Sequence, residues 1–504
     1  MTPLSRLCRH RATAITLLSG AALVLSGCAA IKPATDLETS EKSAASLPPV
    51  PPGWTSARER VGDVRVGWIE AYNDPLLTAL VAEAQANNRN LRAAAANVER
   101  AWALARQAGS PLLPSIDASG TVQNVERLEN GGAGGLPFNL STIPGFERFT
   151  VGVQASWEVD IWGRIRAGQQ SAVESARSTE ADYVFSQYSI AAAVAQSYFL
   201  VIEADQQIAV AQGIVDALTE ISRVVNARYR YGMASAFDVS LAESDLATAV
   251  ESLEAAKNSR LIAVRSLEVL LGRYPAARLK TSGDFPALPA PPGAGLPSEL
   301  LERRPDIIAA ERQIAAAINS RKVAEAAKLP RFSLTTGLNG ASNALEDVLD
   351  PANVLWTVAS NILAPIFDGG ARDAAVDLAD ADVQAAVAIY ADTAINAFGE
   401  VERALDLGVA LRKQRAALER ANQETDNAYR LSVLRYKEGE IDLIDVLSVQ
   451  QRVFAAQSNL IAIRRAELNQ YLDLSLALGG DWRTPGSAQL SPGTATSDAT
   501  AKAP

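Results

Sequence analysis

Two hydrophobic periods alternate along the chain. Between residues 376 and 409 apolar residues recur at intervals of three, four and four, an eleven-residue repeat that indicates a long α-helix with almost no supercoil. Residues 163–271 and 366–484 contain no proline, and each stretch is interrupted once, at Gly232 or Gly439. We therefore expect each to form two long antiparallel helices that reverse at that glycine. The first arm, residues 163–230, would be roughly 100 Å long at a rise of about 1.5 Å per residue.

Four shorter stretches alternate between apolar and polar residues, which is the period of a β-strand. They lie at about 115–125 and 149–158 in the first half of the chain, and at about 331–340 and 353–363 in the second. Each pair follows a shorter helical stretch, at about 75–109 or 305–328. Alternation over about ten residues fits a transmembrane strand or a soluble hairpin. Four such segments in two matched pairs favour the membrane.

This layout occurs twice, and its motifs recur at a constant spacing. Arg-Tyr-Arg-Tyr-Gly at 228–232 is matched by Arg-Tyr-Lys-Glu-Gly at 435–439, and Asp238 is matched by Asp445, in both cases 207 residues later. Upstream, Leu113-Pro114 and Leu329-Pro330 are 216 residues apart. We expect two structural repeats, at 61–272 and 303–483, joined by a linker at 273–302.

The N-terminus has the features of a bacterial export signal. Three arginines precede an apolar run over residues 12–25, which is too short for an ordinary transmembrane helix. Leu25-Ser26-Gly27-Cys28 is similar to a lipobox, in which the chain is cut before an acylated cysteine. The alternative is a plain secretory signal with a chance cysteine. We expect a signal peptide at 1–27, a lipidated tether at 28–60 anchored through Cys28, and a disordered tail at 484–504.

Composition narrows the possible chemistry. Of 504 residues 48% are hydrophobic but only 6% aromatic, and the single His10 and both cysteines, Cys8 and Cys28, lie in the first 28 residues. Without the signal peptide, no histidine and only the acylated cysteine remain, which excludes His- or Cys-based catalysis and metal ligation. We therefore expect no catalytic residue, no metal and no cofactor. A net charge of −10 without a basic stripe makes nucleic acid an unsuitable partner.

Four membrane strands cannot stand alone, because two free edges in lipid would leave backbone groups without hydrogen bonds. The sheet must close by oligomerisation. Two copies give eight strands, whose lumen side chains would fill, whereas three copies give twelve strands and leave an aqueous bore. The trimer is therefore the smallest assembly that forms a channel.

The doubled layout resembles the TolC/OprM-type outer membrane factors. So do Arg303-Arg304-Pro305-Asp306, the R-Y-x-x-G motifs, the Pro-Ile-Phe-Asp-Gly-Gly segment at 365–370 and the Leu-Gly-Gly-Asp-Trp segment at 478–482. With its lipobox, the chain is most similar to the lipoprotein (NodT-like) efflux branch. The resemblance implies a mostly α fold with a small membrane β part. Each repeat is a β-hairpin plus a long helical hairpin, and three chains form a twelve-stranded β-barrel continued by a periplasmic α-helical barrel.

The same resemblance implies a function and partners. The chain would be the passive exit duct of a tripartite efflux system, held in the cell outer membrane by membrane strands and a lipid anchor and reaching into the periplasm. A homotrimer would dock a periplasmic adaptor (membrane fusion) protein that connects it to an inner-membrane pump of the RND type. The docking residues would lie at the two helix tips: Tyr231, Gly232, Met233, Ala234 and Ser235, and Glu438, Gly439, Glu440 and Ile441.

The family closes the periplasmic end of the duct with a gate near the tips. By position, Tyr436, Asp238 and Asp445 match the gate tyrosine and aspartates of the family. Ser448 stands where a second aspartate is often found, and Ile441 where some members carry a basic residue, so an apolar constriction at Ile441 or Ile444 is an alternative. Asp238 and Asp445 equally fit a simpler role, capping the helix that follows each tip.

Three other functions stay open at this stage. The same duct could serve type I secretion of a protein or peptide, which the sequence barely separates from efflux. A non-channel coiled-coil envelope lipoprotein is disfavoured by the apolar positions of the four strands. An enzyme with a carboxylate pair is disfavoured because the acidic residues are spread over helix faces at the spacing of ordinary solvated positions.

Overall fold

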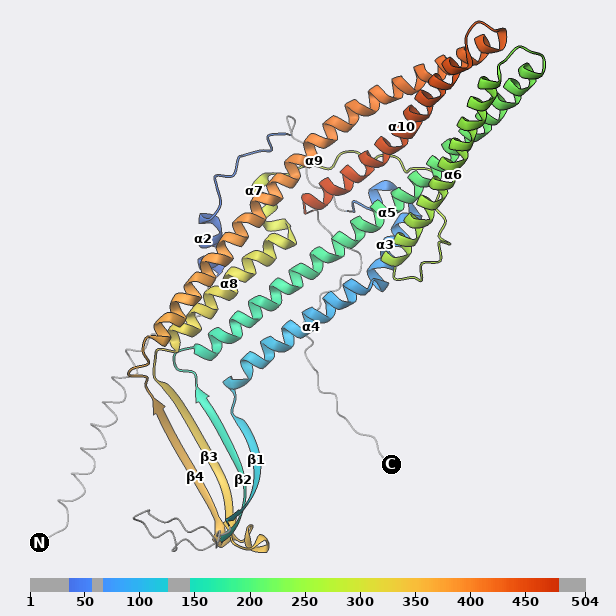
Figure 1. Cartoon of the computed structure of the whole chain (residues 1–504). Helices are drawn as coiled ribbons and strands as arrows, with labels where there is room; N and C mark the ends of the chain where they lie inside the picture. Colours follow the sequence, from blue (N-terminus) through green and yellow to red (C-terminus); the bar gives the residue numbers. More distant parts are fainter. Residues whose placement is uncertain (1–35, 57–66, 126–145, 480–504) are drawn as a thin grey trace, which may run out of the picture. The chain divides into compact units, whose positions relative to one another are not determined.

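The computed structural model describes residues 36–56, 67–125 and 146–479 (Figure 1). Its first half contains α2 (Asp36–Ala45), α3 (Pro75–Asn87), α4 (Arg89–Gly109), β1 (Ser115–Val125), β2 (Phe146–Val159), α5 (Arg164–Arg230) and α6 (Ala236–Leu270). Its second half contains α7 (Pro297–Arg303), α8 (Pro305–Ala326), β3 (Arg331–Ser342), β4 (Val354–Leu363), α9 (Ala371–Glu438) and α10 (Leu443–Ala477). None of the described helices has a stretch long and apolar enough to cross a membrane. Cys28, the signal peptide and the C-terminal tail lie outside the described residues.

The long helices have the predicted bounds, and one shorter helix does not. The first arm, expected at 163–230, is α5 with 67 residues, and its counterpart α9 has 68. The single helix expected at 75–109 is wrong, because α3 and α4 are separate helices with Asn88 between them in an extended conformation. The Asn88 carboxamide oxygen accepts hydrogen bonds from the backbone N–H groups of Asn90 and Leu91, which is how asparagine starts a new helix.

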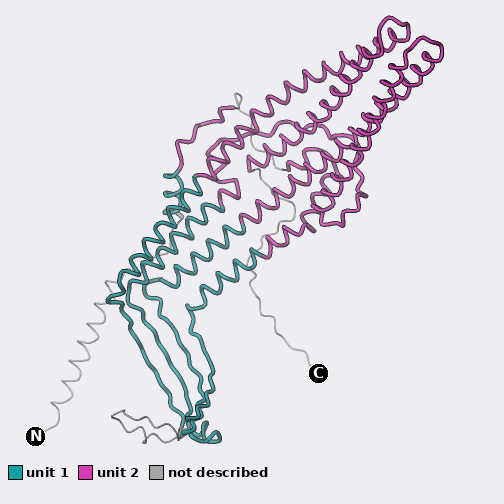
Figure 2. Tube along the Cα trace, viewed as in Figure 1, with its two compact units in different colours: residues 1–46, 97–180, 309–391 teal, residues 47–96, 181–308, 392–504 magenta. Residues whose placement is uncertain are grey.

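The chain divides into two compact units, and each draws on both repeats (Figure 2). Unit 1 comprises residues 1–46, 97–180 and 309–391, which include the four strands and the helix segments that lead into and out of them. Unit 2 comprises residues 47–96, 181–308 and 392–504, which include the greater part of the two long helical hairpins and their tips.

Unit 1 contains one antiparallel sheet in the order β1-β2-β3-β4. The register joins the two hairpins through β2 and β3, with Val153 opposite Leu338, and Leu338 in turn lies opposite Trp356 of β4. Because side chains alternate between the two faces of a sheet, this register places the apolar positions of all four strands on one face. The other face carries mainly polar residues, including Asp117, Gln154 and Thr335.

Part of the segment expected as a tether is structured. In unit 1, α2 is joined to α8 by an ion pair of 3.0 Å between Glu38 and Lys322. In unit 2, the Trp54 side chain is buried and donates a hydrogen bond of 3.0 Å to the carbonyl of Ala294. The backbone N–H groups of the next two residues donate to the carboxylate of Glu402.

The core of unit 2 is built around a small group of aromatic residues. Tyr72, Phe199 and Tyr471 pack against one another, with ring centroids 5.2 and 5.4 Å from Tyr72. The buried Tyr72 hydroxyl donates a hydrogen bond of 2.8 Å to the carbonyl of Leu468 in α10, so that its polar atom does not lack a partner. Burial is also the main reason that the pKa of this hydroxyl is raised.

Candidate functional site: the helix tips and the strand surface

The first tip reverses the chain between α5 and α6 within five residues. Gly232 has a φ of +70°, a left-handed conformation that favours glycine. The N–H of Met233 donates to the carbonyl of Arg228 at 2.8 Å, and the N–H of Gly232 donates to that of Tyr229 at 2.9 Å, which closes the last turn of α5. Ser235 then starts α6.

The second tip repeats this geometry between α9 and α10. Gly439 has a φ of +83°, and the N–H of Glu440 donates to the carbonyl of Arg435 at 2.9 Å. Asp442 occupies the position at which α10 starts. The two tips are therefore the same turn built from different side chains.

Asp238 and Asp445 each complete the first turn of a returning helix. The carboxylate of Asp238 accepts hydrogen bonds from the backbone N–H and the hydroxyl of Ser235, both at 2.8 Å, and its own N–H donates to the serine oxygen. At the second tip the Asp445 carboxylate accepts a longer hydrogen bond of 3.4 Å from the backbone N–H of Asp442, and the Asp445 N–H donates to the backbone carbonyl of Asp442 at 3.2 Å. The first tip therefore has a full capping box, and both aspartates take the capping role that the sequence also allowed.

The two tips expose different chemistry. The first is apolar and aromatic: Tyr231, Met233 and Phe237 are exposed to 79, 61 and 70%. The second is charged, with Arg435, Lys437, Glu438 and Glu440 exposed, and only Ile444, exposed to 56%, is a large apolar side chain open to solvent. Ile441 is half-buried and packs on the cluster described next. The predicted gate residues are thus not one group, because Ile444 and Asp445 face solvent.

Tyr436 lies inside an apolar cluster that joins the two hairpins near their tips. Its side chain is 8% exposed and packs with residues from all four long helices, among them Leu218, Ala242 and Val446. Burial raises the pKa of its hydroxyl, the Arg228 guanidinium opposes that effect, and the Asp238 carboxylate adds to it. The structure therefore brings Tyr436 and Asp238 into one neighbourhood.

Arg228 connects the first tip to the second, a role that the sequence did not reveal. Its Nη1 donates a hydrogen bond of 2.7 Å to the carbonyl of Tyr436, and its Cζ lies 4.8 Å from the centroid of the tyrosine ring. The repeat-equivalent Arg435 instead pairs with Glu440 of its own tip, at 3.4 Å. The two arginines occupy equivalent positions in the repeated motif. Their partners differ because the packing of the hairpins, which the local sequence does not specify, decides them.

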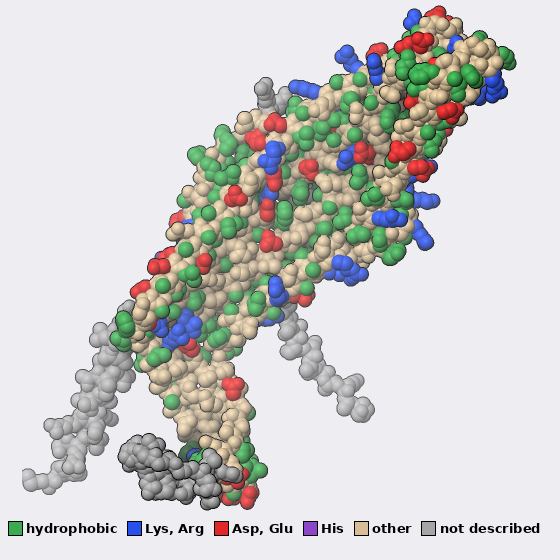
Figure 3. Space-filling model, viewed as in Figure 1, with side chains coloured by type: hydrophobic (Ala, Val, Ile, Leu, Met, Phe, Trp, Pro, Cys, Tyr) green, Lys and Arg blue, Asp and Glu red, His purple; other side chains and the backbone are tan. Residues whose placement is uncertain are grey.

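The strand surface in unit 1 has the character of a lipid-facing sheet. Side chains of its apolar face are open, including Ile116 (72%), Trp356 (74%) and Val358 (59%). In Figure 3 the strand region presents few charged side chains on the face in view. Within the described residues β1 and β4 each have a neighbour on one side only, so both edges of the sheet present unpaired backbone groups.

The described residues contain no group of three or more His, Cys, Asp or Glu side chains placed to hold a metal ion. Near the tips, Asp238 and Asp445 cap helices, and Glu440 pairs with Arg435. The tips thus present surfaces for packing, apolar at the first tip and of mixed charge at the second.

Comparison with known proteins supports the same conclusion. The family model for outer membrane efflux proteins matches residues 80–273 and 296–480. The pyoverdine export outer membrane protein OpmQ of Pseudomonas aeruginosa is 33% identical over 85% of this chain and 90% of its own. The probable efflux pump outer membrane protein TtgC of Pseudomonas putida is 32% identical over 92% of this chain and 95% of its own.

Solved structures agree with the sequence comparison. The CmeC outer membrane channel of Campylobacter jejuni superimposes with a TM-score of 0.78 at 25% identity, over 84% of this chain and 90% of that one. The fold class predicted from sequence is thereby confirmed. Taken with the two matched repeats and the strand surface, these likenesses show that the chain belongs to the outer membrane efflux protein family.

Proposed function

We propose that this protein is the passive outer membrane exit duct of a tripartite efflux system. The observation that carries the proposal is the sheet: one apolar, exposed face and two unpaired edges, on a chain of the outer membrane efflux family. Three copies would join β1 of one chain to β4 of the next, giving twelve strands around a bore wide enough for water. The long helices of the three chains would continue the duct into the periplasm.

The helix tips are proposed to dock a periplasmic adaptor protein, which links the duct to an inner-membrane pump of the RND type. Exposed Tyr231, Met233 and Phe237 offer an apolar anchor, and Glu438 and Glu440 offer an acidic rim. Interfaces of this kind place aromatic side chains at the centre and charges at the edge. The backbone at Gly232 allows a partner helix to approach closely, because an added Cβ there would meet nothing within 4 Å.

We propose a gate of mixed character. Three copies of Asp445 around a three-fold axis would repel one another, and three copies of Ile444 beside them would form an apolar constriction. Tyr436 and Ile441 would act indirectly, because they belong to the packing between the hairpins, and the nearby Asp238 carboxylate would act on the hydroxyl of Tyr436. Opening would then require the contacts of Tyr436 and Arg228 to loosen.

The proposed cargo is small molecules, and the energy for transport comes from the pump. The relatives OpmQ and TtgC are described as a pyoverdine export protein and a probable efflux pump component, which favours efflux over protein secretion. We propose that the chain carries out no catalysis itself. Acylation at Cys28 would add a lipid anchor to the membrane strands, and a Cys28→Ala chain would lose radiolabelled palmitate if this is correct.

Single-channel conductance in planar bilayers tests the duct and its gate. The purified protein should be closed most of the time, and Asp445→Asn should open more often, because asparagine removes the charge while its carboxamide oxygen still caps α10. Asp426→Asn, the same substitution at an exposed aspartate of α9 that pairs with Arg430, is the matched control and should behave as the wild type. Absence of conductance in every variant would refute the duct, and equal opening of Asp445→Asn and wild type would refute the acidic gate.

A further inference from the structure

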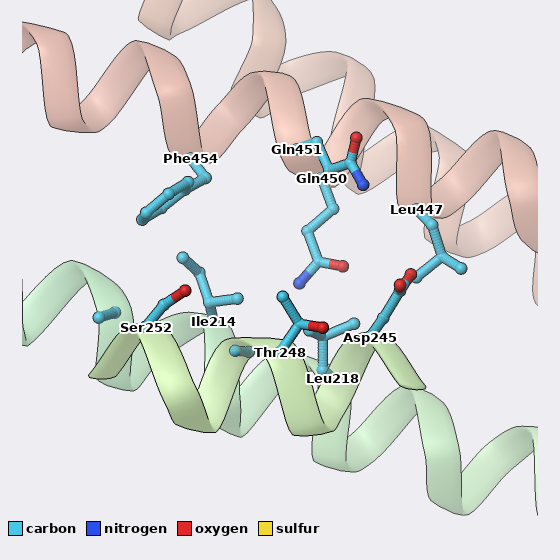
Figure 4. Close-up of a pocket in the computed structure, with 11 residues that line it drawn as sticks. Ile214, Leu218, Asp245, Thr248, Ser252, Leu447, Gln450, Gln451 and Phe454 are labelled. Atoms are coloured by element: carbon cyan, nitrogen blue, oxygen red, sulfur yellow. The ribbon is translucent and has the colours of Figure 1, made fainter. Parts of the chain in front are cut away.

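A cavity of about 160 Å³ lies between the first helical hairpin and α10 (Figure 4). Its lining comes from α5, α6 and α10, all within unit 2. Ile214 and Leu218 of α5 and Phe454 of α10 supply apolar walls, and Asp245 and Thr248 of α6 supply polar ones. A cavity of about 150 Å³ has room for one benzene-sized molecule.

Gln450 points into this cavity without a hydrogen-bond partner. Its side chain is only 7% exposed, and its Nε2 donates to no acceptor among the described residues. Figure 4 shows the carboxamide extending from α10 into the space above Thr248 and Leu218. A buried amide without a partner costs about 1–3 kcal/mol, so an occupant that offers an acceptor here would be favoured.

The internal repeat explains why Gln450 lacks a partner. Its equivalent in the first repeat, 207 residues earlier, is Glu243, which accepts hydrogen bonds from the Ser222 hydroxyl and the Asn226 amide. The positions equivalent to those two partners are Tyr429 and Val433. Neither supplies Gln450 with the short polar group that Glu243 finds in its own hairpin. The second repeat has kept a polar side chain at this position and lost its local partners.

We propose that this cavity is a binding site for a small phenol-class molecule, one apolar ring that carries one hydroxyl group. The ring would lie between Phe454 and the aliphatic side chains of Ile214 and Leu218. A hydroxyl group can accept one hydrogen bond and donate another. It would accept from Gln450 Nε2 and donate to the carboxylate of Asp245 or the hydroxyl of Thr248. A plain hydrocarbon would fill the space but leave Gln450 unpaired.

The cavity shares Leu218 with the apolar cluster around Tyr436, but its occupancy does not depend on conduction. It lies where α10 meets α5 and α6, so a bound ring would bridge the two hairpins. Binding can therefore be tested on purified full-length protein with no transport assay, and a negative result would leave the duct proposal untouched.

The test is a ¹⁹F NMR titration of 4-fluorophenol and fluorobenzene against the full-length protein in detergent, with empty micelles as background. We expect saturable binding of 4-fluorophenol with a dissociation constant on the order of 1 mM, as suits a ligand of so few atoms. Gln450→Leu should raise the dissociation constant of 4-fluorophenol about tenfold, because one hydrogen bond is lost. The dissociation constant of fluorobenzene should stay the same or fall. Gln457→Leu, the same substitution two turns away on α10 and outside the lining, should bind both probes as the wild type does.

Two further variants distinguish binding in this cavity from partition of the probe into the detergent micelle. Ala249→Phe and Ser252→Phe each fill the cavity from α6, and each should abolish saturable binding while helicity by circular dichroism is retained. Two results would overturn the proposal: unchanged binding in a folded cavity-filling variant, or an undiminished preference for the hydroxyl in Gln450→Leu.

Discussion

Asn88 and Arg304 occupy equivalent positions in the two repeats, 216 residues apart, and each holds the end of a returning helix. Asn88 Nδ2 donates to the carbonyl of Leu270 at 2.8 Å, and Arg304 Nη1 donates to that of Ala477 at 3.2 Å. These two carbonyls are themselves 207 residues apart, the spacing of the later repeat motifs. Both acceptors lie in the last turn of a helix, where carbonyl groups lack partners within the helix. Both repeats therefore have a side-chain hydrogen bond to the end of the returning helix, from a neutral side chain in the first repeat and a charged one in the second.

Replacing Arg304 should destabilise unit 2 more than replacing Asn88. Arg304 is 4% exposed and also pairs with Asp306 and Glu400, both at 2.6 Å. Because Glu400 is half exposed, we expect Arg304→Ala to lower the free energy of unfolding by about 3 kcal/mol, and Asn88→Ala by about 1–2 kcal/mol. Denaturant unfolding followed by circular dichroism measures both. Arg303→Ala removes only a surface pair with Glu299 and should change stability by no more than about 0.5 kcal/mol.

Loss of Arg228 should loosen the second tip from the first. Arg228→Gln removes a charged hydrogen bond to Tyr436 and the contact with its ring, together about 2 kcal/mol. Amide hydrogen exchange at residues 429–442 should therefore accelerate by roughly tenfold or more. The matched change Arg435→Gln removes an exposed pair and should leave this exchange nearly unaltered. Equal acceleration in both variants would contradict a bridging role for Arg228.

The buried Glu268 should make unit 2 sensitive to acid. Burial raises the pKa of its carboxyl, but the backbone N–H groups of residues 277–279 outweigh that effect, and the pKa is lowered overall. A lowered folded-state pKa means that the stabilisation is complete above the unfolded value, about 4.3. It is lost as the pH falls through the lower folded value. Exchange protection of residues 277–281 should therefore fall below about pH 4 in the wild type.

Glu268→Gln provides the control for this acid effect. Glutamine retains one acceptor oxygen but no charge, so the loop should already be less protected at pH 7, by about 2 kcal/mol, and should show little further loss below pH 4. A loop whose protection falls identically in both proteins would show that another carboxylate is responsible.

Two Gly→Ala substitutions should change the stability of the protein in opposite directions. At Gly232 an added Cβ meets nothing within 4 Å, so the cost comes from the left-handed backbone alone, about 1 kcal/mol. At Gly213, within α5, an added Cβ also meets nothing within 4 Å, and alanine should stabilise the helix by up to about 1 kcal/mol. Thermal unfolding of both variants tests this prediction. A shift of the unfolding temperature in the same direction for both, relative to the wild type, would refute it.

The sequence predicts the helices and strands well because each has its own period of apolar residues. Strand positions, the long arms and the tip glycines follow from alternation, the eleven-residue repeat and the absence of proline. The break at Asn88 was missed because polar residues are common on helix surfaces. Its capping of α4 and its contact with Leu270 distinguish it only in the structure.

The side-chain roles at the tips were harder to predict. Whether Asp238 caps a helix or faces a bore depends on hydrogen bonds that a spacing cannot specify. The partner of Arg228 is 208 residues away in the chain, so nothing near it in sequence reveals the contact.

The division of the chain has a consequence for how it is made. Each compact unit is assembled from segments of both repeats, so neither repeat contains a complete unit. When the first repeat has been synthesised, β2 must still wait for β3 before the sheet can form across the two hairpins. An unpaired strand edge of this kind is prone to aggregation until the second repeat follows. The two repeats must therefore fold together, because each compact unit needs segments from both of them.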